Sequence, residues 1–197
     1  MNKPEIPTVF LPGSETGVPR ITSCPILGFA AFSGVGKTTL LTQLIPMLRA
    51  RGVRLGMIKH AHHDFDIDTP GKDSYVLRKA GADQMLIASS RRWALMAETP
   101  AQDEADLFQL IARLDQSRLD LILVEGFRHE TFPKIELHRT ELPHPLLCTQ
   151  DKNIIAIATN AELTLALDIP LLNLNDPAQI ADFIQSKLLD RSLPDSA

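Results

Sequence analysis

The segment AAFSGVGKTTLLTQL, residues 30 to 44, constrains the fold of this chain more than any other part of the sequence. It places two glycines, a lysine and two threonines between a short apolar run and a stretch with helical spacing. A helix start exposes unpaired backbone N–H groups and a partial positive charge, and preceding glycines let successive N–H groups point into one concavity. The segment is therefore typical of a phosphate-binding loop between a strand and a helix.

The phosphate-loop pattern G-x-x-x-x-G-K-[ST] is met at every fixed position except the first, where Ala31 stands in place of glycine. Alanine is the smallest change available there, and Ser33 and Gly34 can still support the turn. In this pattern the lysine reaches the β- and γ-phosphates and the next hydroxyl binds Mg²⁺, so these roles fall to Lys37 and Thr38. The predicted nucleotide-binding residues are Ser33, Gly34, Val35, Gly36, Lys37, Thr38 and Thr39.

A phosphate loop also needs an acidic residue for the metal, and the apolar segment LDLILVEG offers two. Asp120 precedes the expected strand and Glu125 ends it. The strand between them spans about 16 Å, so both cannot reach one magnesium ion. Ligands bind at the carboxyl ends of parallel strands. We therefore predict that Glu125 binds the metal, through a metal-bound water, and that Asp120 is a solvated strand start.

From about Pro25 onward, short apolar runs alternate with stretches of helical period. Helices are expected over 37–52, 71–82, 103–115 and 176–190. The alternation predicts an α/β fold of the P-loop NTPase type, with a mostly parallel sheet covered by helices on both faces. Two stretches, at about 85–98 and 134–150, look more antiparallel and are expected to form a sheet edge or outlying strands.

The length of 197 residues fits one domain, or one domain with a small appendage. Residues 1–24 carry four prolines and show no sustained period, which predicts an irregular N-terminal tail. The P-loop nucleotide-binding domain is expected over 25–190, and a C-terminal tail over 191–197.

Composition excludes several classes of protein. The formal net charge of −4 gives no basic field for nucleic acid. Cys24 and Cys148 lie far apart in the sequence, which favours free thiols in a reducing compartment over a disulfide scaffold. Apolar runs fall short of the roughly 18 residues of a membrane span, and the N-terminus shows no secretory signal pattern. We expect a cytoplasmic protein that binds neither nucleic acid nor membrane.

Four segments carry a resemblance to a known family: FAAFSGVGKTTLL, IKHAHHDFDIDTPGKDSYVLRKAGA, RRWALM and DLILVEGFRHE. Together they resemble the MobB family, the GTP-binding adaptors of molybdopterin guanine dinucleotide biosynthesis. The resemblance covers nearly all of residues 25 to 190 and includes the Ala31-type loop start. It implies binding of GTP with Mg²⁺, an adaptor role beside the guanylyltransferase that makes the dinucleotide cofactor, and a homodimer. Proteins that carry molybdopterin are a second class of expected partner.

The polar segment KHAHHDFDID follows the second expected strand and admits three interpretations. It can be a mobile switch loop near the γ-phosphate, in which Asp64 or Asp66 acts on Mg²⁺ or on water. It can be a transition-metal site built from His60, His62 and His63, or a merely solvated loop. Its place at the carboxyl end of the sheet favours the first interpretation, so Asp64 and Asp66 are the predicted catalytic residues.

Selection of the base is less defined, because the guanine motif N-K-x-D does not occur in the sequence. Asn160, Asn173, Asn175 and Asp176 end expected strands and are the candidates. Asp176 also fits the N-cap of the last helix, which is its favoured role. A preference for guanine therefore follows mainly from the resemblance.

Two further side-chain types bear on function. Trp93, the single tryptophan, is expected to pack in the core rather than to anchor an interface. Arg78 and Arg128 are the nearest candidates for an arginine finger, and neither is a clear one. Since such a finger contributes about 10³–10⁵ in rate, we expect at most slow intrinsic GTP hydrolysis.

Two other function classes stay open. A P-loop small-molecule kinase would share the phosphate loop but should also show an arginine-bearing lid and an acceptor pocket. A metal-insertion GTPase would share the fold and use the histidines, and would usually add a cysteine or histidine metal motif and N-K-x-D.

Overall fold

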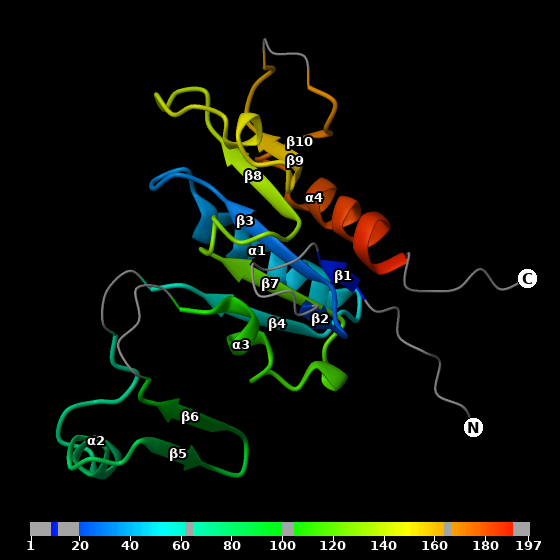
Figure 1. Ribbon diagram of the computed structural model, residues 1–197. Helices are drawn as coiled ribbons and strands as arrows, with labels where there is room; N and C mark the ends of the chain where they lie inside the picture. Colours follow the sequence, from blue (N-terminus) through cyan, green and yellow to red (C-terminus); the bar gives the residue numbers. More distant parts are fainter. Residues whose placement is uncertain (1–8, 12–19, 62–64, 100–104, 164–166, 191–197) are drawn as a thin grey trace, which may run out of the picture. The chain divides into compact units, whose positions relative to one another are not determined.

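The computed structural model describes residues 9–11, 20–61, 65–99, 105–163 and 167–190 (Figure 1). The chain divides into two compact units. The larger comprises residues 1–60 and 106–197, and the smaller comprises residues 61–105.

A six-stranded sheet organises the larger unit, with the strand order β10–β9–β8–β3–β7–β4 (Figure 1). All neighbouring strands in it are parallel. The strands are β3 (Ile26–Ala30), β4 (Leu55–Lys59), β7 (Leu121–Glu125), β8 (Lys134–His138), β9 (Ile154–Thr159) and β10 (Leu171–Asn173). The expected α/β fold with a mostly parallel sheet is confirmed.

Helices cover both faces of this sheet, as expected. On one face, leucines of α1 (Lys37–Ala50) pack with α4 (Pro177–Ile184) and with Leu121 and Leu123 of β7. On the other face, α3 (Leu107–Ile111) packs against Ile122 and Val124 of the same strand. Alternate side chains of β7 are thus buried in two different cores, which is why its sequence is continuously apolar.

Shorter helical elements complete the larger unit. They are the 3₁₀ turns η1 (Gln116–Arg118) and η2 (Leu147–Thr149) and the π-helical turn η3 (Gln185–Leu189), which continues α4. The helix expected over 103–115 is observed as the short α3, whose N-cap is Asp106. Asp176 caps α4 by accepting from the backbone N–H groups of Ala178 and Gln179, both at 3.1 Å, as predicted.

The antiparallel arrangement expected for the stretch 134–150 is wrong, because the strand within it, β8, is parallel to its neighbours. β8 pairs in parallel with β3 on one side and with β9 on the other. Its alternation of polar and apolar residues is typical of a half-solvated strand, but Lys134 and Glu136 are both buried. The polar positions of β8 therefore make contacts inside the protein and do not face solvent.

Both buried charges of β8 have partners. The Lys134 ammonium donates to Asp151 Oδ2 at 2.9 Å and to the backbone oxygen of Glu130 at 2.6 Å. The Glu136 carboxylate accepts from the backbone N–H groups of Leu147 and Cys148, at 2.7 and 2.8 Å. Burial raises the pKa of Glu136 against the opposing effect of these two hydrogen bonds.

In the smaller unit, α2 (Asp73–Lys79) precedes a hairpin of β5 (Gln84–Ala88) and β6 (Trp93–Ala97). The two strands are antiparallel, which confirms the outlying antiparallel pair expected near 85–98. The expectation that Trp93 lies in the core is wrong, because its side chain is 67% exposed. A two-stranded hairpin has no second layer of its own against which a large ring could be buried.

Near the N-terminus, β1 (Val9–Leu11) pairs antiparallel with β2 (Arg20–Thr22). These two strands lie within the segment expected to be an irregular tail, and the tail expected at 191–197 lies outside the described residues. None of the helices in the described part of the chain has the length and apolar character that crossing a bilayer requires.

The ion pair of Lys134 and Asp151 generates a prediction about stability. Replacing Asp151 with asparagine leaves the buried ammonium without its anion, so we expect the free energy of unfolding to fall by about 3 kcal/mol. The double variant Lys134→Met, Asp151→Asn removes both charges and should recover much of that loss. Urea denaturation measures both, and equal losses in the single and double variants would contradict the interpretation.

The same pair sets the pH dependence of stability. Burial alone would raise the pKa of Asp151, but hydrogen bonds from Lys134 and Asn153 outweigh it and lower the pKa. The Asp151 contribution to stability is therefore complete above its unfolded pKa of about 3.9 and is lost as pH falls through the lower folded pKa. Asp151→Asn should make the unfolding free energy less dependent on pH in this acidic range.

Candidate functional site

The phosphate-loop segment lies between β3 and α1, in the context that its sequence requires. Gly34 and Gly36 have φ angles of +82° and +104°, which L-residues with side chains rarely adopt. Gly36 is the N-cap of α1, and among the described residues no side chain caps that helix start. The unpaired N–H groups of the first turn, with their partial positive charge, are thus available to an anion.

Glu125 lies beside this loop because β7 pairs with β3. Phe29 of β3 and Lys59 of β4 are its two neighbours across the sheet. Its carboxylate oxygens lie 3.8 Å from Lys37 Nζ and 3.6 Å from Lys59 Nζ, and the side chain is largely buried. The structure therefore brings together Lys37 and Glu125, which the sequence placed in one site, and adds Lys59 as a second cation.

Asp120 lies at the opposite end of β7, at the amino edge of the sheet. Arg54 donates to it from Nη2 at 2.7 Å, from Nε at 2.9 Å and from its backbone N–H at 2.7 Å. The side-chain hydrogen bond from Arg54 is the main reason that the pKa of Asp120 is lowered. Asp120 thus holds β4 and β7 together at a distance from the phosphate loop.

The turn after Glu125 is fixed by close backbone packing. His60 donates its backbone N–H to the Glu125 carbonyl oxygen at 2.8 Å. Gly126 has a φ of +93°, and a Cβ there would lie 2.5 Å from His60 Cβ. Phe127 also has a positive φ, of 51°, and its ring centroid is 4.8 Å from that of His60. The glycine after Glu125 is therefore required by both conformation and space.

Arg139 is a site residue that sequence reasoning missed. It follows β8, and its Nε donates to the backbone oxygen of Val35 in the phosphate loop at 2.9 Å. On the same loop, the Phe32 ring stacks on His144 with centroids 4.4 Å apart. Arg139 is distant from the loop in sequence, and it could be found only by knowing that β8 is the neighbour of β3.

The candidates for base selection have different surroundings. Asn160, after β9, donates from Nδ2 to Glu141 Oε1 at 2.6 Å and accepts from the Thr140 backbone N–H at 3.2 Å. Asn173 Oδ1 accepts from the backbone N–H of Asn175 at 2.9 Å. Asp176 is occupied as the N-cap of α4.

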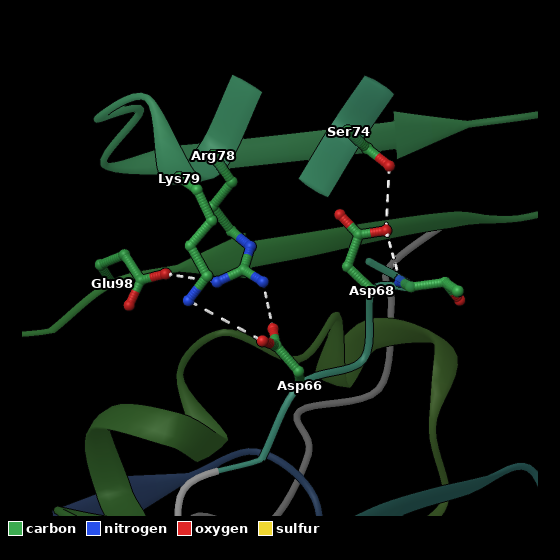
Figure 2. Close-up of polar contacts among 7 residues, drawn as sticks. Asp66, Asp68, Ser74, Arg78, Lys79 and Glu98 are labelled. Atoms are coloured by element: carbon green, nitrogen blue, oxygen red, sulfur yellow. Dashed lines mark hydrogen bonds and ion pairs between the residues drawn. The ribbon is translucent and has the colours of Figure 1, made fainter. Parts of the chain in front are cut away.

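In the smaller unit, Asp66 belongs to an ion-pair cluster (Figure 2). Its carboxylate accepts from the Arg78 guanidinium and lies 3.9 Å from Lys79 Nζ. Arg78 also donates to Glu98 at 2.9 Å, and this hydrogen bond is the main reason that its pKa is raised. The cluster joins the segment before α2 to α2 itself and to the residue after β6.

Next to this cluster, Asp68 orders the start of α2 (Figure 2). Its Oδ1 accepts from the backbone N–H of Thr69 and from Ser74 Oγ, both at 3.0 Å. Asp64, His62 and His63 lie outside the described residues. The catalytic roles of Asp64 and Asp66 therefore stay predictions. In the described part of the chain, no group of three or more His, Cys, Asp or Glu side chains is arranged to hold a metal ion.

The chain matches the family described as molybdopterin guanine dinucleotide synthesis protein B over residues 26–160. It is 56% identical over 164 residues to the molybdopterin-guanine dinucleotide biosynthesis adapter protein of Escherichia coli (strain K12), covering 83% of this chain and 93% of the relative. The adapter protein of the same name from Haemophilus influenzae (strain ATCC 51907 / DSM 11121 / KW20 / Rd) is 46% identical over 164 residues, which are 83% of this chain and 89% of that protein.

Solved structures agree with these sequence matches. A crystal structure of molybdopterin-guanine biosynthesis protein B superimposes with a TM-score of 0.66 at 27% identity, covering 83% of this chain and 98% of that one. The structure of Bacillus subtilis MobB gives a TM-score of 0.64 at 27% identity, with 83% and 97% covered. These relatives do not favour the kinase or the metal-insertion GTPase. The predicted resemblance is confirmed, and the chain belongs to the molybdopterin guanine dinucleotide synthesis protein B family.

Proposed function

We propose that this chain is a GTP-binding adaptor of molybdopterin guanine dinucleotide biosynthesis, acting beside the guanylyltransferase that makes the dinucleotide. Membership of a family whose relatives are named adapter proteins supports the role. The main support for nucleotide binding is that Lys37 lies close to Glu125, next to two glycines of positive φ. Proteins that carry molybdopterin remain a second proposed class of partner.

The geometry suits a magnesium-bound triphosphate. At 3.8 Å, the contact between Lys37 and Glu125 is too long for a direct hydrogen bond. Lys37 therefore loses little interaction energy when its ammonium group moves to a phosphate. Charge-assisted hydrogen bonds to phosphate oxygens are stronger. The Thr38 hydroxyl and the Glu125 carboxylate are oxygen donors of the kind that Mg²⁺ prefers, and they would hold it here, Glu125 through a metal-bound water.

Slow intrinsic hydrolysis is part of the proposal. Arg78, one of the candidate arginine fingers, donates to Asp66 and Glu98. Asp66 must leave this pair before it can orient a water molecule. We therefore expect turnover by the protein alone to lie well below the roughly 1–100 s⁻¹ of kinases, and to rise when a partner protein docks.

A homodimer is the proposed assembly, and the smaller unit supports it. A unit of this size buries little apolar surface by itself. Several of its apolar side chains are more than half exposed: Phe65, Ile67, Val76, Leu77, Leu86 and Trp93. A second copy of the chain would cover them, with Trp93 as an interface anchor.

The proposed location is the cytoplasm. Both cysteines are free thiols, which is compatible with a reducing compartment. Burial is the main cause that raises the pKa of Cys24 to about 11, so this thiol is unreactive at neutral pH.

The experiment that tests the proposal is a titration of the purified protein with GTP and ATP, each with and without Mg²⁺, and with molybdopterin. We expect GTP to bind more tightly than ATP and Mg²⁺ to strengthen its binding. A protein that binds neither nucleotide under any of these conditions would remove the proposal.

Lys37→Ala should weaken triphosphate binding about 10- to 100-fold, because a charge-assisted hydrogen bond contributes about 1.5–3 kcal/mol. Lys59→Ala is the comparison, since Lys59 also lies beside Glu125 but ends β4 rather than following the glycine turn, and we expect it to weaken GTP binding less. Calorimetric titration with GTP measures both, and an unchanged affinity in folded Lys37→Ala contradicts the phosphate-loop assignment.

Glu125→Gln should reduce the gain in GTP affinity that Mg²⁺ provides, because the amide is a weaker partner for a metal-bound water. Asp120→Asn should leave that gain unchanged, since Asp120 is at the other end of β7. The measurement is GTP affinity with and without Mg²⁺ for both variants. Equal effects, or the reverse order, would mean that the metal lies elsewhere.

Trp93→Glu should dissociate the proposed dimer, because it places a charge at an apolar anchor, and truncation of such an anchor alone costs about 2 kcal/mol or more. Leu110→Glu is the control, because Leu110 is also exposed but lies on α3 of the larger unit. Sedimentation velocity gives the oligomeric state. A dimer that tolerates Trp93→Glu but not Leu110→Glu would move the interface to the larger unit.

A further inference from the structure

The β8 side of the phosphate loop carries polar groups that the phosphate and metal sites do not use. Arg139 reaches the loop itself, at the Val35 carbonyl oxygen. Two residues further on, Glu141 is joined to Asn160 by a hydrogen bond of 2.6 Å. These three residues follow β8 and β9, whose carboxyl ends lie at the same edge of the sheet as the end of β3.

The alternation of side chains along β8 assigns Arg139 to one face. Leu137 packs in the same core as the α1 leucines and Ile180 of α4. Glu136 faces the other way, because its carboxylate binds the backbone of η2. Arg139 therefore continues the Leu137 side, toward the start of α1, and its contact with Val35 agrees with this placement.

The sheet order defines where a nucleoside would extend from the loop. Strand β3 has β7, with Glu125, on one edge and β8 on the other. In the proposed function the metal-bound end of the triphosphate lies by Glu125. The opposite, nucleoside end then extends toward the β8 side, where Arg139 and the Glu141–Asn160 pair lie.

Glu141 is held as an ionised acceptor. Its own backbone N–H and the Asn160 amide lower its pKa, and Arg139 contributes in the same direction. The Asn160 Oδ1 atom accepts from the Thr140 backbone N–H at 3.2 Å, which fixes the orientation of the Asn160 amide. A carboxylate fixed in this way suits a ligand that presents two N–H donors side by side.

We propose that Glu141, positioned by Asn160, binds the N1–H and 2-amino edge of the guanine base, and that Arg139 lies against the base between this edge and the phosphate loop. The inference rests on the proposed binding of GTP and names the residues that select the base. Adenine presents an acceptor at N1 and no 2-amino group, so the carboxylate would face a lone pair and would reject it. The flat guanidinium of Arg139 is suited to stacking on an aromatic face.

The test is a calorimetric titration of GTP, ATP and xanthosine triphosphate against the wild-type protein and Glu141→Gln. We expect wild type to prefer GTP. Glu141→Gln should lose about 10- to 100-fold in GTP affinity, with ATP affinity unchanged. It should gain affinity for xanthosine triphosphate, because the glutamine amide can donate to the xanthine 2-oxo group.

Glu162→Gln is the matched control. Glu162 follows Asn160 by two residues and is also exposed, but it lines a cavity of about 360 Å³, with His138 and Thr140, whose lining does not include Glu141. This variant should keep the wild-type preference for GTP. A ratio of GTP to ATP affinity that is the same in Glu141→Gln as in wild type, or that changes equally in Glu162→Gln, overturns the proposal.

Two further outcomes separate the base site from the phosphate site. Equal GTP and ATP affinities in wild type, both lost in Lys37→Ala, would keep the phosphate loop and overturn the base assignment. No nucleotide binding by wild type would overturn the proposed function and this inference together.

A pterin has the same 2-amino-4-oxo edge as guanine, so 6-hydroxymethylpterin is titrated in parallel. Loss of pterin binding alone in Glu141→Gln would assign the edge to a pterin and overturn the guanine assignment.

Discussion

The position of β3 between β7 and β8 is the constraint on which the candidate site depends. Its pairing with β7 sets Glu125 next to the loop that follows β3, and its pairing with β8 brings Arg139 to the other side of the same loop. Register matters as much as order, because side chains alternate between faces. Leu121 and Leu123 share a face with α1, so Glu125 faces Lys37, whereas a slip of one residue would turn the carboxylate to the α3 side.

Strand β8 holds this position through polar contacts that are costly to bury and therefore specific. Lys134 and Glu136 would each be strongly unfavourable in an apolar interior without a partner. Asp151 and the backbone of Glu130 satisfy the first, and the backbone of η2 satisfies the second. Both sets of partners lie in the connections flanking β8. The contacts thus couple the placement of the strand to the path of the 139–150 segment, which carries Arg139 and Glu141.

The parts of the site predicted from the sequence are those that local chemistry determines. The glycine turn, Lys37 and the strand that ends in Glu125 each follow from a short pattern with a physical reason, and the alternation of elements predicts the parallel sheet. Asn160 was among the candidates for base selection, because it ends an expected strand. Arg139 and Glu141 could not be found in this way, because their proposed role depends on which strand neighbours β3. The polar alternation of β8 predicts an antiparallel, half-solvated strand for a related reason, since a sequence pattern does not distinguish solvent from a buried polar partner. Trp93 is an error of the opposite kind. An aromatic residue in a strand predicts burial, but the sequence does not show whether another element is present to cover it.

The two units divide the chemistry of the chain between them. The larger has a sheet with a core on each face, and it holds Lys37 and Glu125 on elements packed into those cores. The smaller has a short helix and one hairpin, and its order rests on polar contacts such as those of Arg78 and Asp68, while large apolar side chains face outward. Nucleotide recognition requires groups fixed to within fractions of an ångström, which a rigid sheet edge provides. In the proposed dimer, an apolar surface that a second chain covers is exposed before assembly, which a unit without a second layer allows. The proposed adaptor role combines nucleotide binding with assembly, and the candidate surfaces for the two lie in different units of this chain.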